Sequence, residues 1–382
     1  MWYWARLAAV VVAVAGTGCV KRLEIVAVFP DGSGKLVSSF DGDEADVRQG
    51  DALPTSESGW QVREHVEIKP ADSPGEPDKR ELKIVASRRI GMGEDWPDSY
   101  AIDGTRLARI AVRFPTQVWM EERPEGTYYH FRRVYQGRRM ARINHMQERI
   151  LEQDSLKGLL EKDPAVLSAA EWRALVGAFI EVEREKTRAF LDRAVAGLES
   201  PLRQDAWLAA RQAAGRAYDR PGLEEEAAEI AKSEDSGDRF LVIEKRIRAE
   251  VEANVRAALA EQSVSDAAID RVIDGLKLAA EDFEISEDIG DEQWRVSVVL
   301  PGRIIAHNSE SNPDRVKDEA QDGDDEQSIE AIELGALMAD LRVYMADGAI
   351  FESVEWEFQG DALYDADLVL AATSFVPRPM ER

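Results

Sequence analysis

The sequence predicts an α+β fold in which an antiparallel, β-rich domain is split by an inserted bundle of about five helices. Before residue 131 and after residue 283, several stretches alternate apolar and polar residues, which is the period of a half-buried strand. Between residues 132 and 282 the apolar residues recur every three or four positions, which is the period of a helix packed on one face. We therefore expect four segments, namely 1–18, 19–131, 132–282 and 283–382.

Several stretches before residue 131 carry the strand pattern. The first places one apolar face on Leu23, Ile25, Ala27 and Phe29, and the turn sequence PDGSG (30–34) then reverses the chain into a hairpin. The later ones are WQVREHVEIK (60–69), ELKIVAS (81–87) and RLARIAVRF (106–114). After residue 283 the pattern returns in WRVSVVL (294–300), VEWEF (354–358) and DLVLAATSFV (367–376).

The central region has helix signals of its own. Ser168 and Glu171 have the spacing of a capping box. They precede an apolar stripe made of Trp172, Leu175, Val176 and Phe179. A second stripe contains Ile243, Ile247, Val251, Val255 and Leu259. Short links between such segments predict antiparallel helices that form one bundle.

Composition excludes some classes of function. The chain has 48 basic and 74 acidic residues, so its formal net charge is −26. Binding to nucleic acid depends on neutralising phosphates, so we expect no nucleic-acid partner. The hydrophobic fraction of 44% is that of a folded protein rather than a disordered one.

The start of the chain has the pattern of a secretory signal. Arg6 precedes an uncharged run, residues 7–20, which is shorter than the roughly 20 apolar residues of a membrane-spanning helix. Within it, Gly16-Thr17-Gly18-Cys19 contains the single cysteine and resembles the lipobox of bacterial lipoproteins. The resemblance implies that Cys19 carries the lipid, palmitate included, and anchors the chain in the bacterial cell envelope. Cleavage after Ala15 is the alternative, and it would leave Cys19 as a free thiol.

A second resemblance rests on motifs spread along the chain. The cysteine is followed by the PDGSG turn, and later by an LPG turn (300–302) and the strand sequence WEFQG (356–360). This arrangement resembles bacterial lipoproteins of the LppM-like type. The resemblance implies a β-rich domain that binds a lipid or a glycolipid.

No motif predicts a reaction or a metal site. DGSGK (31–35) lacks the spacing of a phosphate loop and predicts a hairpin turn. None of the four histidines lies in an H-E-x-x-H pattern, and no G-x-S-x-G sequence is present. The acidic loop 310–327 lacks the ligand spacing of an EF-hand, so whether it binds calcium stays open. We expect no cofactor, no metal and no catalytic residues.

A basic cluster stands out against the acidic background. It contains Arg132, Arg133, Arg138, Arg139 and Arg142. One hypothesis is that these arginines contact anionic lipid head groups, and the other is that they pair with the acidic body of the protein. Neither the ligand, the membrane leaflet nor the oligomeric state follows from the sequence.

The sequence as a whole predicts an exported, membrane-anchored lipoprotein that acts as a non-enzymatic binding or interaction module. Its expected partners are the membrane, through the lipid anchor, and a lipid or an envelope protein. Two alternatives stay open. One is a β-cup that binds an apolar ligand, and the other is a hydrolase whose active site has no recognisable motif.

Overall fold

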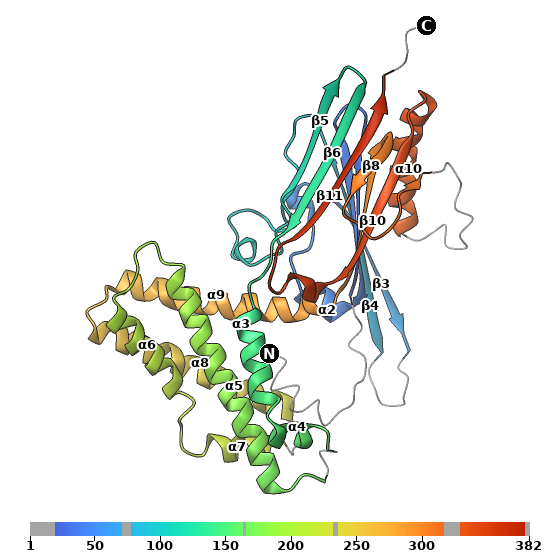
Figure 1. Cartoon of the computed structure of the whole chain (residues 1–382). Helices are drawn as coiled ribbons and strands as arrows, with labels where there is room; N and C mark the ends of the chain where they lie inside the picture. The colour runs from blue at the N-terminus through green and yellow to red at the C-terminus, as the bar shows by residue number, and fades with distance from the viewer. Residues whose placement is uncertain (1–19, 71–77, 163–165, 232–235, 317–328, 379–382) are drawn as a thin grey trace. The chain divides into compact units, whose positions relative to one another are not determined.

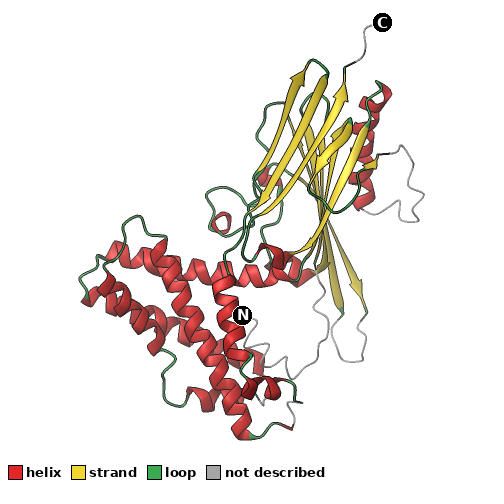
Figure 2. Cartoon of the chain, in the orientation of Figure 1, coloured by secondary structure: helices red, strands yellow, loops and turns green. Residues whose placement is uncertain are grey.

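The computed structural model describes residues 20–70, 78–162, 166–231, 236–316 and 329–378. Helices and antiparallel-rich sheets are both present, so the predicted α+β class is confirmed (Figure 2). The described residues form two compact units. The helical unit contains residues 140–284, and the sandwich unit contains residues 20–139 and 285–378.

The larger sheet of the sandwich unit has the strand order β3-β4-β2-β1-β7-β10-β9. Its strands are β1 (Lys21–Val28), β2 (Gly34–Asp43), β3 (Gln61–Lys69), β4 (Lys79–Ile90), β7 (Gln293–Pro301), β9 (Asp314–Arg315) and β10 (Phe351–Gln359). Strands β1 and β2 form the expected hairpin. In its turn Gly32 has φ 82°, and the Asp31 carboxylate accepts a hydrogen bond from the Ser33 amide at 2.9 Å. The segment DGSGK is therefore a hairpin turn, as predicted.

The smaller sheet has the order β5-β6-β11-β8 (Figure 1). Its strands are β5 (Thr116–Arg123), β6 (Gly126–Tyr135), β8 (Arg303–His307) and β11 (Leu368–Pro377). Both sheets combine strands from the two sides of the helical segment. In the larger sheet β1 pairs in parallel with β7, and in the smaller sheet β6 pairs antiparallel with β11.

The two sheets pack face to face through aromatic side chains. The ring of Tyr135 on β6 lies 5.4 Å from that of Trp294 on β7 and 5.5 Å from that of Phe358 on β10. Helix α10 (Ile329–Ala346) covers the other face of the larger sheet. Leu337 and Leu341 of α10 belong to one apolar cluster with residues of β1, β2, β4 and β7. A short helix, α2 (Glu44–Gln49), follows β2.

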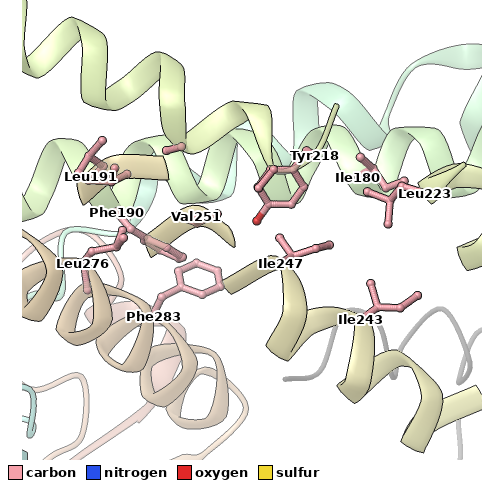
Figure 3. Packing of buried hydrophobic residues seen from close by; sticks show 14 of the residues in the cluster. Ile180, Phe190, Leu191, Tyr218, Leu223, Ile243, Ile247, Val251, Leu276 and Phe283 are labelled. Carbon is pink, nitrogen blue, oxygen red and sulfur yellow. The ribbon is translucent and has the colours of Figure 1, made fainter. Parts of the chain in front are cut away.

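The helical unit contains helices α3 to α9. They are α3 (Ala141–Leu151), α4 (Asp154–Leu160), α5 (Ala169–Ala196), α6 (Gln204–Arg216), α7 (Leu223–Ile230), α8 (Ser236–Glu261) and α9 (Asp266–Gly290), the last of which continues into the sandwich unit. The capping box is confirmed, because Ser168 and Glu171 each accept a hydrogen bond from the other's amide. Both predicted stripes are buried, and all of their residues except Leu175 belong to one core cluster, in which the rings of Phe190 and Phe283 lie 5.5 Å apart (Figure 3).

The expected start of the helical segment at residue 132 is wrong. Strand β6 continues to Tyr135, and the first helix of the helical unit begins at Ala141. The charged Arg133 occupies an inward position of β6, where an apolar residue would have revealed the alternation. The expected number of helices is also wrong, because the short helices α4 and α7 raise it from about five to seven among the described residues.

The expected strand at 106–114 is not formed. Leu107–Arg109 is a 3-10 turn, and the residues after it belong to no strand. Val112 and Phe114 are nevertheless buried. Their amides donate to the Asp51 carboxylate at 2.9 Å and to the Asp98 carbonyl at 2.7 Å. The alternating apolar residues therefore reflect burial in the sandwich core, with the backbone hydrogen bonds made outside any ladder.

Candidate functional site

One buried ionic group lies between the two sheets. Glu24 of β1 and Arg133 of β6 form an ion pair, and both side chains are fully buried. The Tyr135 hydroxyl also donates to the Glu24 carboxylate, at 2.8 Å, and the Arg133 Nε donates to the Thr116 hydroxyl at 2.8 Å. The prediction that Arg133 contacts lipid head groups is therefore wrong, because its guanidinium is enclosed in the core.

A second buried ionic group is centred on Arg22. Its guanidinium lies 3.2 Å from the Asp51 carboxylate and 2.9 Å from the Glu292 carboxylate. It also stacks over the Trp294 ring at 3.9 Å. Burial raises the pKa of Glu292 to about 7, although the nearby Arg22 charge acts in the opposite direction. One guanidinium faces two carboxylates here, so keeping one of them protonated balances the charge.

Both ionic groups are part of the core of the sandwich. Within each group the charged atoms contact their own partners and the surrounding aromatic rings. Breaking one partner of such a pair leaves an uncompensated buried charge, which makes correct pairing of the two sheets a condition of folding.

The remaining predicted arginines separate into buried and exposed residues. Arg138 is buried, and its Nε donates to the Ser286 hydroxyl at 2.8 Å, so its predicted contact with head groups is also wrong. Arg132, Arg139 and Arg142 are exposed. Arg139 lies 3.9 Å from Asp367 and Arg142 lies 3.8 Å from Asp192. The sequence cluster is thus divided among strand β6, the segment after it and helix α3.

The strongest candidate for a binding surface is the face of the smaller sheet that points away from the larger sheet. We call it the outer face. Strands β5, β6 and β11 lie side by side in this sheet (Figure 1), and their pairing register places three rows of residues across the outer face. The rows are Gln117, Arg132 and Ala371; Trp119, His130 and Thr373; and Glu121, Tyr128 and Phe375.

Trp119 lies in the middle row of this face, on the edge strand β5. Its side chain is among the exposed large hydrophobic residues, at 47% exposure, although its ring stacks on the His130 imidazole at 4.8 Å. The His130 Nδ1 lies 3.1 Å from the Thr373 hydroxyl, which holds the imidazole in place behind the indole. Beside this row, the rings of Tyr128 and Phe375 lie 4.8 Å apart.

Charged groups lie among these rings. Arg123 donates two hydrogen bonds of 2.9 Å to the Glu121 carboxylate, and its guanidinium lies 4.7 Å from the centre of the Tyr128 ring. The pairing with Arg123 lowers the pKa of Glu121, so this carboxylate stays ionised at neutral pH. Arg303 of β8 pairs with Phe375 of β11 in the sheet and extends the polar border on that side.

The remaining candidates from the sequence concern metal ligands, histidines, a membrane-spanning helix, Cys19 and the acidic loop. Within the described ranges, no group of three or more His, Cys, Asp or Glu residues is placed to hold a metal ion. His145 lies 3.2 Å from Glu148 on the exposed surface of α3. No helix in the part of the chain that the structure describes is long and apolar enough to cross a membrane. Cys19 and residues 317–327 of the acidic loop lie outside the described residues.

Comparison with protein-family models, curated proteins and solved structures finds no significant match to this chain. The assignment of a site therefore depends on geometry. The sequence prediction missed the outer face, although a signal for it exists. TQVWMEER (116–123) and TYYHFRRVY (127–135) both contain the β-branched and aromatic residues typical of strands, and the short segment between them, PEG (124–126), has the composition of a hairpin turn.

Proposed function

We propose that this protein is an exported, lipid-anchored lipoprotein of the bacterial cell envelope that acts as a non-enzymatic binding module. Its ligand binds on the outer face of the smaller sheet, and Cys19 attaches the chain to the membrane. The observation that carries the binding part is the exposure of Trp119 on a sheet face where rings and hydrogen-bonding groups alternate. Large exposed aromatic side chains are the residues that most often dominate binding energy at a surface.

The alternative of a lipid-binding cup between the sheets has less support. The space between them holds Arg133, Tyr135 and Trp294, all fully or nearly fully buried. An apolar ligand placed there would displace these side chains and would leave the charge of Glu24 without its partner. We therefore assign the ligand to the outer face.

The anchor is tested by metabolic labelling. Wild-type protein expressed with its leader in a bacterial host should incorporate labelled palmitate and sediment with membranes. Cys19→Ala should incorporate no label and should leave the membrane fraction. Labelling of the alanine variant, or a mature N-terminus at Gly16, would contradict the anchor.

The binding surface is tested separately with the soluble chain from residue 20 onward. Trp119→Ala should reduce retention on a crude cell-envelope fraction. Met120→Ala is the matched control, because Met120 is the next residue of β5, is 42% exposed and pairs with Tyr129 on the opposite side of the sheet. Equal retention of the two variants would contradict a binding role for the outer face.

A further inference from the structure

The outer face combines a flat apolar group with hydrogen-bonding groups on either side of it. On strand β5, Gln117 and Glu121 flank Trp119 at two residues each, which places them roughly 7 Å along the strand from the indole. The amide of Gln117 supplies donors and an acceptor, and the ionised carboxylate of Glu121 supplies acceptors. Across the sheet, the Thr373 hydroxyl and the Arg132 guanidinium add further groups to the same face.

This combination matches the chemistry of a sugar ring. A pyranose presents C–H bonds on a face, which pack against an aromatic ring, and hydroxyl groups at its rim, which donate and accept hydrogen bonds. The indole is held flat and ordered by its stack on His130, so little freedom is lost when a sugar packs on it.

Other occupants match the face less well. A lipid or the apolar core of a protein partner would cover Arg132 and Glu121 without offering them hydrogen bonds, which is costly for charged groups. A nucleic acid or another polyanion is repelled at long range by a chain of net charge −26. The hydroxyl groups of a neutral ligand can form hydrogen bonds with the charged side chains, and such a ligand is not repelled by the net charge of the chain.

From these contacts we infer that the outer face binds a neutral carbohydrate polymer, with one sugar ring packed on Trp119. The inference rests on the proposed binding function and specifies its ligand. The side chains of Gln117 and Glu121, which lie on the same strand as Trp119, then hydrogen-bond the hydroxyls of that sugar and of its neighbours along the polymer.

The test is co-sedimentation of the soluble chain from residue 20 onward with insoluble, protein-free polysaccharides. The panel contains cellulose and chitin, which are uncharged. Purified peptidoglycan sacculi, whose peptides carry ionised carboxylates, serve as the charged-glycan comparison, and vesicles of phosphatidylglycerol serve as the lipid comparison. At least one polysaccharide should retain the wild-type chain, and soluble oligosaccharides of the same sugar should release it. Trp119→Ala should weaken this retention roughly tenfold or more, and Met120→Ala should leave it unchanged.

Thermal unfolding followed by circular dichroism verifies that the Trp119 variant is folded. Retention by none of the polysaccharides, equal loss in the two variants, or binding to the vesicles alone would overturn the carbohydrate proposal. These outcomes are independent of the palmitate experiment. If the chain binds the crude envelope fraction through Trp119 but binds none of the polysaccharides, the carbohydrate proposal is refuted. The proposed binding function is then still supported.

Discussion

The ionisation of Glu292 should make the stability of the protein depend on pH in a defined window. Its carboxylate is buried beside Arg22 and Asp51, and burial raises its pKa from the ordinary value of 4.5 to about 7. Between these two values the folded chain holds a proton that the unfolded chain releases. The stability that protonated Glu292 contributes to the fold is therefore fully present below about pH 4.5, and it is lost as the pH rises through about 7.

The size of this effect follows from the difference in pKa. Each unit of pKa difference corresponds to about 1.36 kcal/mol, so a rise from 4.5 to about 7 costs the folded state about 3 kcal/mol at alkaline pH. Glu292→Gln replaces the carboxyl by a neutral amide of the same shape. The variant should match the wild type near pH 4.5 and should exceed it in stability by up to about 3 kcal/mol near pH 8.

Urea unfolding of both proteins across this range, followed by tryptophan fluorescence, measures the difference at each pH. Comparing the two proteins at the same pH cancels the other titrating groups. Among these, the exposed Glu171 has a pKa that Lys162 and Ser168 lower to about 2. Its titration therefore affects stability only at lower pH. If the free energies of unfolding of the two proteins stay parallel from about pH 4.5 to pH 8, Glu292 is not protonated in the folded core and the reasoning fails.

Three further predictions concern the architecture. Arg133→Met should reduce the free energy of unfolding by about 3–5 kcal/mol, because it leaves the charge of Glu24 buried without a partner. Adding Glu24→Gln should restore much of this free energy, because the double variant has no unpaired buried charge. Chemical denaturation of the single and double variants measures both effects. Residues 140–284 expressed alone should be helical by circular dichroism and melt cooperatively, and a non-cooperative melt would show that this unit needs the sandwich. Gly302→Ala should destabilise the protein by about 1–3 kcal/mol in thermal melts, since Gly302 has φ 84° and a Cβ there meets the carbonyl of Phe375; an unchanged melting temperature would contradict the strain.

The parts of the fold that follow from the sequence are those with local patterns. The hairpin at PDGSG and the helix capped by Ser168 and Glu171 need only neighbouring residues, and both are formed as predicted. Helix α10 was missed because the segment 329–346 is apolar nearly all around and follows the acidic loop. Its partner is the sheet, where its Asp340 pairs with Arg89 and Lys35, so its position depends on contacts far along the chain.

The interior of the sandwich was beyond prediction for a different reason. An arginine inside a strand normally indicates a solvent-facing position, and residues 132–149 together resemble a basic surface. Arg133 is instead neutralised by Glu24, which is 109 residues earlier in the chain. A buried charge is recognisable only once its partner is known, and no local pattern in the sequence connects the two.

The outer face illustrates the same limit for function. Trp119, His130 and Thr373 form one row, yet His130 and Thr373 are 243 residues apart and the whole helical unit lies between them in the sequence. The row exists because β6 pairs with β11 in a register that aligns these two residues. A shift of that register by one residue would turn Thr373 to the opposite side of the sheet and bring a buried residue of β11 to the outer face. The buried pair of Glu24 and Arg133 determines a different part of this arrangement, namely which side of β6 faces the larger sheet. Since successive side chains of a strand point to opposite faces, the inward position of Arg133 places His130, three residues earlier, on the outer face. The ionic core of the sandwich and its exposed aromatic row are therefore linked through β6, and the register between β6 and β11 adds Thr373 to the row.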